Sequence, residues 1–195
     1  MDDMTKAMTG HDMVWHLAAN TDIAAGMKDV KVDLESNTIG TINVLEAMRD
    51  HGIKTIVFTS TSAVYGEPDI SPTSETFGPL LPISYYGASK LACEGYISSY
   101  CEAIGIKAYI FRFANVVGGR MTHGVIRDFV LKLKKNPREL EIWGDGNQYK
   151  SYFLAEDCID AMLHVAKTAN SHCDIYNLSA RSRSRVRRIG EIVIE

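Results

Sequence analysis

The sequence has few of the features that mark metal-binding, secreted or membrane-spanning proteins. Its four cysteines form no C-x-x-C pair and have no metal-ligand spacing, so we expect free thiols in a reducing cytoplasm and no bound metal. No basic-then-apolar leader opens the chain, and no apolar run is long enough to cross a bilayer. The formal net charge of -3 gives no electrostatic reason to expect a nucleic-acid partner. We therefore expect a cytoplasmic protein without nucleic-acid or membrane partners.

The only basic cluster lies near the C-terminus, where arginines alternate with serines over residues 181–188. Such a run can contact phosphate, but a charge run is more often solvated. We expect a solvated tail here.

The order of apolar runs predicts an α/β protein. A chain of 195 residues suffices for one domain, or for a domain and part of a second. Short β-branched and aromatic runs alternate with stretches of helical period, and a loop with four prolines covers residues 66–82. This alternation predicts a doubly wound parallel sheet of Rossmann-like type. The expected strands are residues 13–17, 55–59, 107–113 and 174–178, and the expected helices are residues 33–50, 87–104, 125–135 and 156–167.

A glycine-rich turn is missing from this pattern. A dinucleotide-binding fold opens with a strand, a G-x-G-x-x-G turn and a helix, and no such turn occurs in the sequence. The turn supplies the main site for a dinucleotide pyrophosphate, at a helix N-terminus. We therefore expect an incomplete fold that lacks its first strand and binds a dinucleotide weakly.

The strongest chemical signal is the segment SYYGASK, in which Tyr86 and Lys90 are four residues apart. On a helix this spacing places both side chains on one face. A phenol has a pKa of about 10, and a nearby ammonium favours the phenolate. The pair can therefore move a hydroxyl proton, although the spacing alone also arises by chance in many helices.

A run of hydroxyl side chains, FTSTSAVYG at residues 58–66, follows the second expected strand. Ligands of parallel sheets bind at the carboxyl ends of the strands, so one of these hydroxyls can share a substrate proton with Tyr86. A Ser/Thr turn that merely ends the strand suits the same residues.

Together these motifs resemble the extended short-chain dehydrogenases that act on nucleotide sugars, the NAD-dependent epimerases and dehydratases. Further matches follow in family order: HLAA at 16–19, NTIGTINVLEAM at 37–48, RFANVVGGR at 112–120 and GDGNQYKSY at 144–152. The resemblance implies a Rossmann-like core over residues 1–118 and part of a small substrate-binding lobe over residues 119–195.

The resemblance also implies roles for individual residues. Tyr86 is implied as the acid/base, with Lys90 tuning it and holding the nicotinamide ribose, and Thr61 as the catalytic hydroxyl. Implied NAD contacts, besides Tyr86 and Lys90, are Leu17, Ala18, Ala19, Thr21, Asn37 and Thr59. Implied nucleotide-sugar contacts, besides Thr61, are Asn115, Trp143 and Lys150. At Lys150 many relatives have arginine, and lysine offers a point charge in place of a bidentate fork.

His16 belongs to one of these motifs but has a simpler explanation. Its neighbours Trp15 and Leu17 mark a buried segment. We expect a hydrogen-bonded core histidine rather than a catalytic one.

The resemblance implies a 4-epimerase of the UDP-glucose/UDP-galactose type that works through a transient 4-keto sugar. Dehydratases of the family commonly have Asp-Glu after the position of Thr61, where this chain has Ser62 and Ala63. A 4,6-dehydratase or reductase of the same family is the first alternative, and a non-catalytic truncated relative or fragment is the second. Helices 37–50 and 87–104 match those with which family members dimerise, so we also expect a homodimer.

Overall fold

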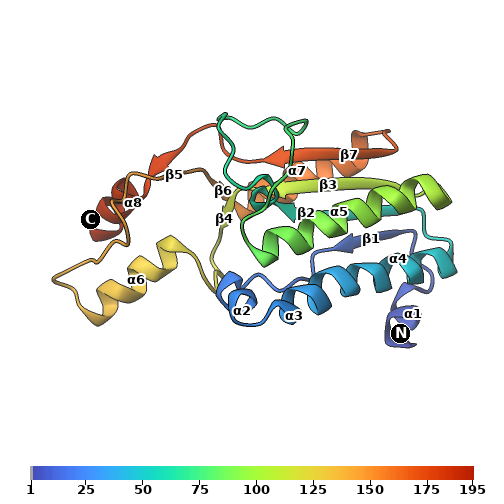
Figure 1. The fold of residues 1–195 in the computed structure, drawn as a ribbon, viewed down its shortest axis with the longest axis horizontal. Helices are drawn as coiled ribbons and strands as arrows, with labels where there is room; N and C mark the ends of the chain where they lie inside the picture. Colours follow the sequence, from blue (N-terminus) through green and yellow to red (C-terminus); the bar gives the residue numbers. More distant parts are fainter. Residues whose placement is uncertain (1) are drawn as a thin grey trace. The chain divides into compact units, whose positions relative to one another are not determined.

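The protein is described by a computed structural model covering residues 2–195, and these residues form two compact units (Figure 1). Unit 1 contains residues 1–113 and 162–177, and unit 2 contains residues 114–161 and 178–195. The predicted domain boundary at residue 118 stays a prediction. Helix α7 (Ala155–Thr168) begins in unit 2 and ends in unit 1.

A four-stranded sheet organises unit 1, in the order β1 (Met13–His16), β2 (Thr55–Thr61), β3 (Lys107–Phe113) and β7 (Cys173–Leu178). The pairs β1–β2 and β2–β3 are parallel, with Val14 opposite Ile56 and Ile56 opposite Ala108. The Ala108 amide donates to the His172 carbonyl, and the Ala114 amide donates to the Leu178 carbonyl. The residue numbers increase together on the two strands, so β3 and β7 also run parallel. The predicted α/β fold with a Rossmann-like parallel sheet is confirmed.

Helices precede and connect these strands. They are α1 (Asp2–Met8), α2 (Ile23–Lys28), α3 (Val30–Asp33), a π-helical turn (Leu34–Ile39), α4 (Gly40–His51) and α5 (Tyr85–Ile104). The Ser84 hydroxyl caps α5 by accepting from the Gly87 amide at 3.0 Å. Gly105 ends α5 in the left-handed conformation, at φ 68°. The helix that bears Tyr86 and Lys90 is therefore defined at both ends by its own sequence.

Strand alternation divides the core of unit 1 between two faces of the sheet. Ile56 and Phe58 of β2 and Ala108 and Ile110 of β3 belong to one apolar cluster with Ile97 of α5. The other face carries Val57, Tyr109 and Phe111, which are also buried. Tyr109 donates from its hydroxyl to the carbonyl of Ala169, just beyond α7, at 2.9 Å. Both faces of the central strands are covered, as expected for a doubly wound sheet.

Unit 2 is built from short strands and two helices. Strand β4 (Asn115–Val117) pairs with β6 (Tyr152–Leu154) in parallel, and β5 (Tyr149–Lys150) pairs with β8 (Ser184–Arg185) in antiparallel. Helices α6 (Val125–Lys135) and α8 (Val186–Ile194) share a small core around Phe129.

The expected solvated tail at residues 181–188 is correct in one respect, because its five arginines are exposed, but the segment is not a tail. Residues 184–185 form β8, and α8 begins at Val186. Val186 and Ile189 are 4% and 6% exposed and pack against Phe129. Apolar residues at helical spacing inside and beyond the arginine run provide the buried face that holds this segment in place.

A short 3₁₀ turn (Ser62–Tyr65) follows β2, and the proline-rich residues 66–82 form neither helix nor strand, as predicted. Within residues 2–195, no helix combines the length and the apolar character needed to cross a membrane.

Candidate active site at the end of strand β2

Tyr86 lies in the first turn of α5, beside the end of β2. Its phenol lies close enough to the side chain of Thr61, the last residue of that strand, for Thr61 to lower the pKa of the phenol. The Thr61 hydroxyl also accepts from the Ala63 amide at 3.1 Å, which fixes its position at the strand end. The structure thus brings together the phenol and the hydroxyl that the sequence motifs singled out.

Lys90 lies one helical turn after Tyr86 and is 2% exposed. Its ammonium donates to the Thr59 carbonyl at 2.8 Å and stands 4.6 Å from the centre of the Phe58 ring. Burial lowers the pKa of Lys90 to about 8, while Cys93 and Glu94 raise it. A buried cation with one carbonyl acceptor is suited to titrate near neutral pH.

The electrostatics of Tyr86 differ from what its spacing to Lys90 suggested. Burial raises the pKa of the Tyr86 phenol, the hydrogen bond with Thr61 lowers it, and the negative charge of Asp33 raises it. Desolvation penalises the phenolate more than the hydrogen bond favours it. The phenol is therefore protonated at neutral pH in this structure.

Four predicted cofactor contacts follow β1. Leu17, Ala18 and Thr21 are exposed and Ala19 is half-buried. Their position at the carboxyl end of a parallel strand is where such sheets bind ligands. Their roles stay predictions.

Asn37 is 1% exposed and joins the segment after β1 to helix α5. Its Oδ1 accepts from the Asn20 amide at 2.7 Å, and its Nδ2 donates to the Ser89 hydroxyl at 2.9 Å. The Ser89 hydroxyl in turn donates to the Tyr86 carbonyl at 2.8 Å. Asn37 thus acts in this structure as a bridge between two segments of the site.

Sequence reasoning missed Asp33, which is 1% exposed beside the same bridge. Its Oδ1 accepts from Asn20 Nδ2 at 2.7 Å, and its Oδ2 has no hydrogen-bond partner. A Cβ on Gly26 would come within 1.9 Å of that oxygen, so only glycine fits there. Nothing in the local sequence distinguishes Asp33 from a helix-start aspartate, because its partner Asn20 is 13 residues away.

The remaining predicted substrate contacts lie in unit 2. Trp143 and Lys150 both line a cavity of about 710 Å³ between α6, residues 142–150 and the start of α8. Trp143 is 79% exposed, and its Nε1 donates to Glu141 at 3.1 Å. Asn115 is not among the residues that line this cavity; its Nδ2 donates to the Ser151 carbonyl at 3.0 Å.

His16 is a core residue, as predicted, although the neighbours on which the prediction rested, Trp15 and Leu17, are 37% and 54% exposed. It is 7% exposed, its Nε2 is 2.9 Å from the Thr41 hydroxyl, and its ring packs against Phe58 at 5.6 Å. Burial, followed by the positive charge of Lys90, lowers the pKa of His16 to about 4.

Acidification is expected to destabilise the fold through His16. Since the folded pKa is about 4 and the ordinary value is 6.5, the unfolded chain binds the proton first. Stability from this group is complete above pH 6.5 and falls as the pH drops towards 4, by on the order of 3 kcal/mol in total. Urea unfolding of wild type and His16→Gln at pH 7 and 4.5 measures the difference. The exposed His123→Gln serves as control, and equal pH dependence in all three proteins would contradict the prediction.

Within the described residues, no group of three or more His, Cys, Asp or Glu side chains is placed to hold a metal ion. All four cysteines are free.

Comparison with known proteins decides the family. The family model described as the NAD dependent epimerase/dehydratase family matches residues 1–179. The chain belongs to this family. Among curated epimerase/dehydratase relatives, a putative UDP-glucose 4-epimerase of Methanocaldococcus jannaschii is 36% identical over 187 residues, which are 93% of this chain and 60% of the relative. A UDP-glucose 4-epimerase of Corynebacterium glutamicum is 29% identical over 93% of this chain and 56% of its own length.

Solved structures of epimerase/dehydratase members have the same fold. A UDP-galactose 4-epimerase superposes with a TM-score of 0.88 at 37% identity, over 98% of this chain and 65% of that one. A Thermus thermophilus UDP-glucose 4-epimerase in complex with NAD gives a TM-score of 0.85 at 30% identity, over 98% and 64%. The chain spans about 60% of the length of the relatives it matches.

Proposed function

We propose that this protein is an NAD-dependent nucleotide-sugar 4-epimerase of the UDP-glucose/UDP-galactose type. The observation that carries the proposal is the meeting of Tyr86, Lys90 and Thr61 at the end of β2. The epimerases named above, together with a Thermotoga maritima UDP-glucose 4-epimerase with UDP-glucose (TM-score 0.89, 28% identity, 98% of this chain and 63% of that one), support the choice of reaction.

In the proposed mechanism, the Tyr86 phenol exchanges a proton with the 4-hydroxyl of the sugar. The Thr61 hydroxyl hydrogen-bonds the same sugar oxygen and shares the proton with Tyr86. The ammonium of Lys90 favours the phenolate when Tyr86 gives up its own proton. NAD, when bound, would supply the hydride acceptor and donor for carbon 4 of the sugar, with the 4-keto sugar turning over in between.

The residues at the ends of β1 and β2 fit the nicotinamide and ribose end of NAD. The buried Lys90 ammonium and the Thr59 hydroxyl, which donates to the His16 carbonyl at 3.4 Å, offer polar contacts to a ribose, and the exposed residues Leu17 and Ala18 offer a surface for a ring. We further propose contacts from Ala19, Thr21 and Asn37. The sequence has no G-x-G-x-x-G turn, so the proposed fit is confined to this end of the cofactor.

We propose that the cavity of unit 2 binds the nucleotide part of a substrate. Trp143 offers an aromatic ring, and Lys132 and Lys150 offer cations for an anionic ligand. The Lys132 ammonium lies 4.9 Å from the centre of the Trp143 ring and 3.0 Å from Glu141 Oε2. Asn115 is proposed as a phosphate contact from the family motif alone.

A 4,6-dehydratase remains the second candidate, because the dTDP-glucose 4,6-dehydratase DesIV of Streptomyces venezuelae has the same fold (TM-score 0.90, 25% identity). Dehydration needs a carboxylic acid to expel the C6 hydroxyl. The two residues after Thr61 are Ser62, which is exposed, and Ala63, and neither provides one. The site chemistry therefore favours epimerisation.

The experiment supplies the protein with NAD and UDP-galactose and separates the sugar nucleotides by anion-exchange chromatography. We expect UDP-glucose to form, and UDP to inhibit its formation. A parallel reaction with dTDP-glucose tests for a 4-keto-6-deoxy product. Formation of that product without UDP-glucose would favour the dehydratase, and absence of both products would favour a non-catalytic relative.

We also propose a cytoplasmic homodimer formed through α4 and α5, as in the family resemblance. Tyr96 on the outer side of α5 is 44% exposed, which supports a partner on that face. A single-chain mass in sedimentation velocity would contradict this proposal.

A further inference from the structure

Helix α5 contacts each of the last three residues of β2. The Tyr86 phenol interacts with the Thr61 side chain, Lys90 donates to the Thr59 carbonyl, and Glu94 accepts from the Ser60 hydroxyl at 2.5 Å. Residues four apart lie on the same side of a helix. The proposed mechanism uses the first two contacts and leaves the third, Glu94, without a role.

Glu94 is 5% exposed and is held by Arg112 of β3, which is 3% exposed. The guanidinium donates from Nη2 to Glu94 Oε2 at 2.7 Å and from Nε to Oε1 at 3.1 Å. This two-point contact fixes the orientation of a carboxylate as well as its position. Ser60 and Arg112 are register partners on adjacent strands, so one carboxylate joins α5 to both β2 and β3.

Glu94, Ser60 and Arg112 lie where the apolar side chains of β2 and β3 that pack against α5 come to an end. On the side of the sheet that packs against α5, β2 presents Ile56, Phe58 and then Ser60, while β3 presents Ala108, Ile110 and then Arg112. The last residue of each row is polar and both contact Glu94. The ion pair therefore begins where the apolar packing of α5 stops.

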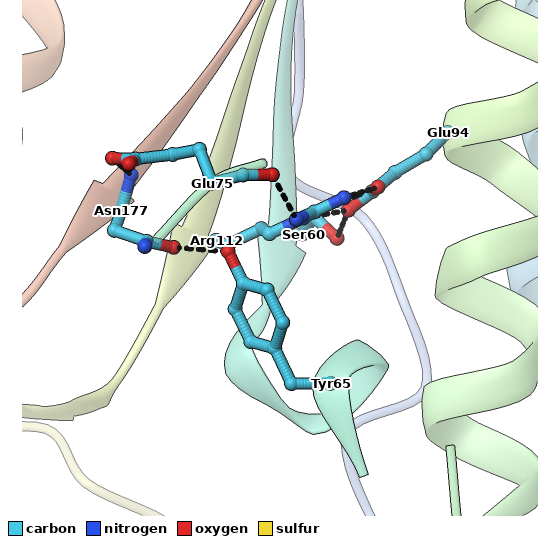
Figure 2. A network of polar contacts seen from close by, with 6 residues as sticks. All are labelled: Ser60, Tyr65, Glu75, Glu94, Arg112 and Asn177. Carbon is cyan, nitrogen blue, oxygen red and sulfur yellow. Dashed lines mark hydrogen bonds and ion pairs between the residues drawn. The ribbon is translucent and has the colours of Figure 1, made fainter. Parts of the chain in front are cut away.

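Arg112 is itself restrained on its other sides, as Figure 2 shows. Its Nη1 donates to the Glu75 carbonyl at 3.3 Å, and its guanidinium lies 4.8 Å from the centre of the Tyr65 ring. The Tyr65 hydroxyl donates to Asn177 Oδ1 at 2.8 Å, and the Asn177 amide donates to Glu75 Oε1 at 2.9 Å. Arg112 thus has a fixed place from which to orient Glu94.

Stability alone does not account for this arrangement. Removing two charges from water is unfavourable, and apolar residues of similar volume are often as stabilising as a buried ion pair. An ion pair differs from apolar packing in fixing one register of the helix against the strands. That register determines how Tyr86 and Lys90 face Thr61.

We propose that Glu94, held by Arg112 and Ser60, is a positioning residue that sets Tyr86 and Lys90 against the end of β2. The inference rests on the proposed function, because it assigns Glu94 to the same proton transfer. Glu94 acts through Tyr86 and Lys90 and does not touch the substrate.

The position of Glu94 also has an electrostatic consequence for Lys90. The negative charge of Glu94 raises the pKa of Lys90 against the larger lowering by burial. Neutralising Glu94 therefore lowers the pKa of Lys90 further. The other titratable or charged groups around Lys90 and Tyr86 are His16 from β1, Asp33 from α3, Cys93 from α5 and Arg112 from β3.

The test compares Glu94→Gln with Glu102→Gln. Glutamine keeps the shape and the acceptor for Ser60 but removes the charge that orients Arg112. Glu102 is on the same helix, and its side chain is 81% exposed. For Glu94→Gln we expect kcat to fall at least tenfold, KM to stay within about twofold, and the alkaline limb of the kcat profile to move to lower pH. Glu102→Gln is expected to match wild type in all three.

Two further measurements separate a failure of this inference from a failure of the proposed function. Arg112→Lys keeps the charge but loses the two-point contact, so we expect a smaller fall in kcat than in Glu94→Gln. Nitrogen-15 NMR titration of the Lys90 ammonium needs no activity, and we expect a lower pKa in Glu94→Gln than in wild type or Glu102→Gln. If the wild-type protein forms no UDP-glucose, the proposed function fails while this titration still tests Glu94. An unchanged kcat profile or an unchanged Lys90 pKa in folded Glu94→Gln would overturn the inference.

Discussion

Replacing Tyr86 by phenylalanine is expected to lower the epimerase kcat by about 10²- to 10⁴-fold, the usual contribution of a general acid/base. The substitution removes one oxygen from a half-buried side chain that lies beside Thr61. The helix cap and the contacts of Lys90 do not involve that oxygen, so the fold should persist. Conversion of UDP-galactose in the presence of saturating NAD measures the effect.

The neighbouring tyrosine provides a matched control. Tyr85 is 48% exposed and precedes Tyr86 on the same helical turn. Tyr85→Phe should therefore keep wild-type kcat. Because burial raises the pKa of Tyr86, wild-type activity should also increase as the pH rises from neutral, and this increase should be absent from the residual activity of Tyr86→Phe. If both variants turn over at the same rate as wild type, Tyr86 is not the acid/base.

Replacing Arg112 by methionine is expected to lower the free energy of unfolding by about 3–5 kcal/mol. The side chains of Arg112 and Glu94 are 2% and 5% exposed, so methionine would leave a buried carboxylate without its cation. Urea unfolding followed by circular dichroism measures the change. Adding Glu94→Leu should restore part of the loss, because the second substitution removes the unpaired charge.

An exposed ion pair on the same protein serves for comparison. The Arg49 side chain is 49% exposed and contacts Glu46 at 2.6 Å on α4. Exposed pairs contribute little to stability, so Arg49→Met should leave the urea midpoint close to that of wild type. Equal urea midpoints for Arg112→Met and Arg49→Met would contradict the prediction. They would mean that water or a rearrangement of the chain compensates for the lost cation.

Local sequence patterns predicted several of the main helices and strands closely, because their signals are local. The strand at residues 107–113 and the helix at residues 125–135 agree with β3 and α6, and α5 starts two residues earlier than expected because Ser84 is its cap. The short strands β4, β5 and β6 gave no local signal, since strands of two or three residues have no periodicity to detect. The strand and helix within residues 184–194 were not predicted for a different reason. The arginines of this segment indicated a solvated run, and its apolar residues were not recognised as the buried face of a helix.

The candidate site was predictable only where its residues form motifs. Tyr86, Lys90 and Thr61 belong to two short segments, and helical and strand geometry bring these segments together. Asp33 and the Glu94–Arg112 pair were not found, because their partners lie 13 and 18 residues away in sequence and on other elements. The Glu94–Arg112 contact also depends on the pairing of β2 with β3, which no local pattern describes.

The network around Arg112 also constrains the order in which the chain can assemble. Glu94 meets Ser60 and Arg112 over 34 and 18 residues, whereas Tyr65 meets Asn177 over 112 and Asn177 meets Glu75 over 102. Closing the longer loops costs more conformational entropy and needs β7 to be in place first. We therefore expect the helix–strand half of the network to form early in folding, and the contacts of Glu75 and Asn177 to be among the last to form.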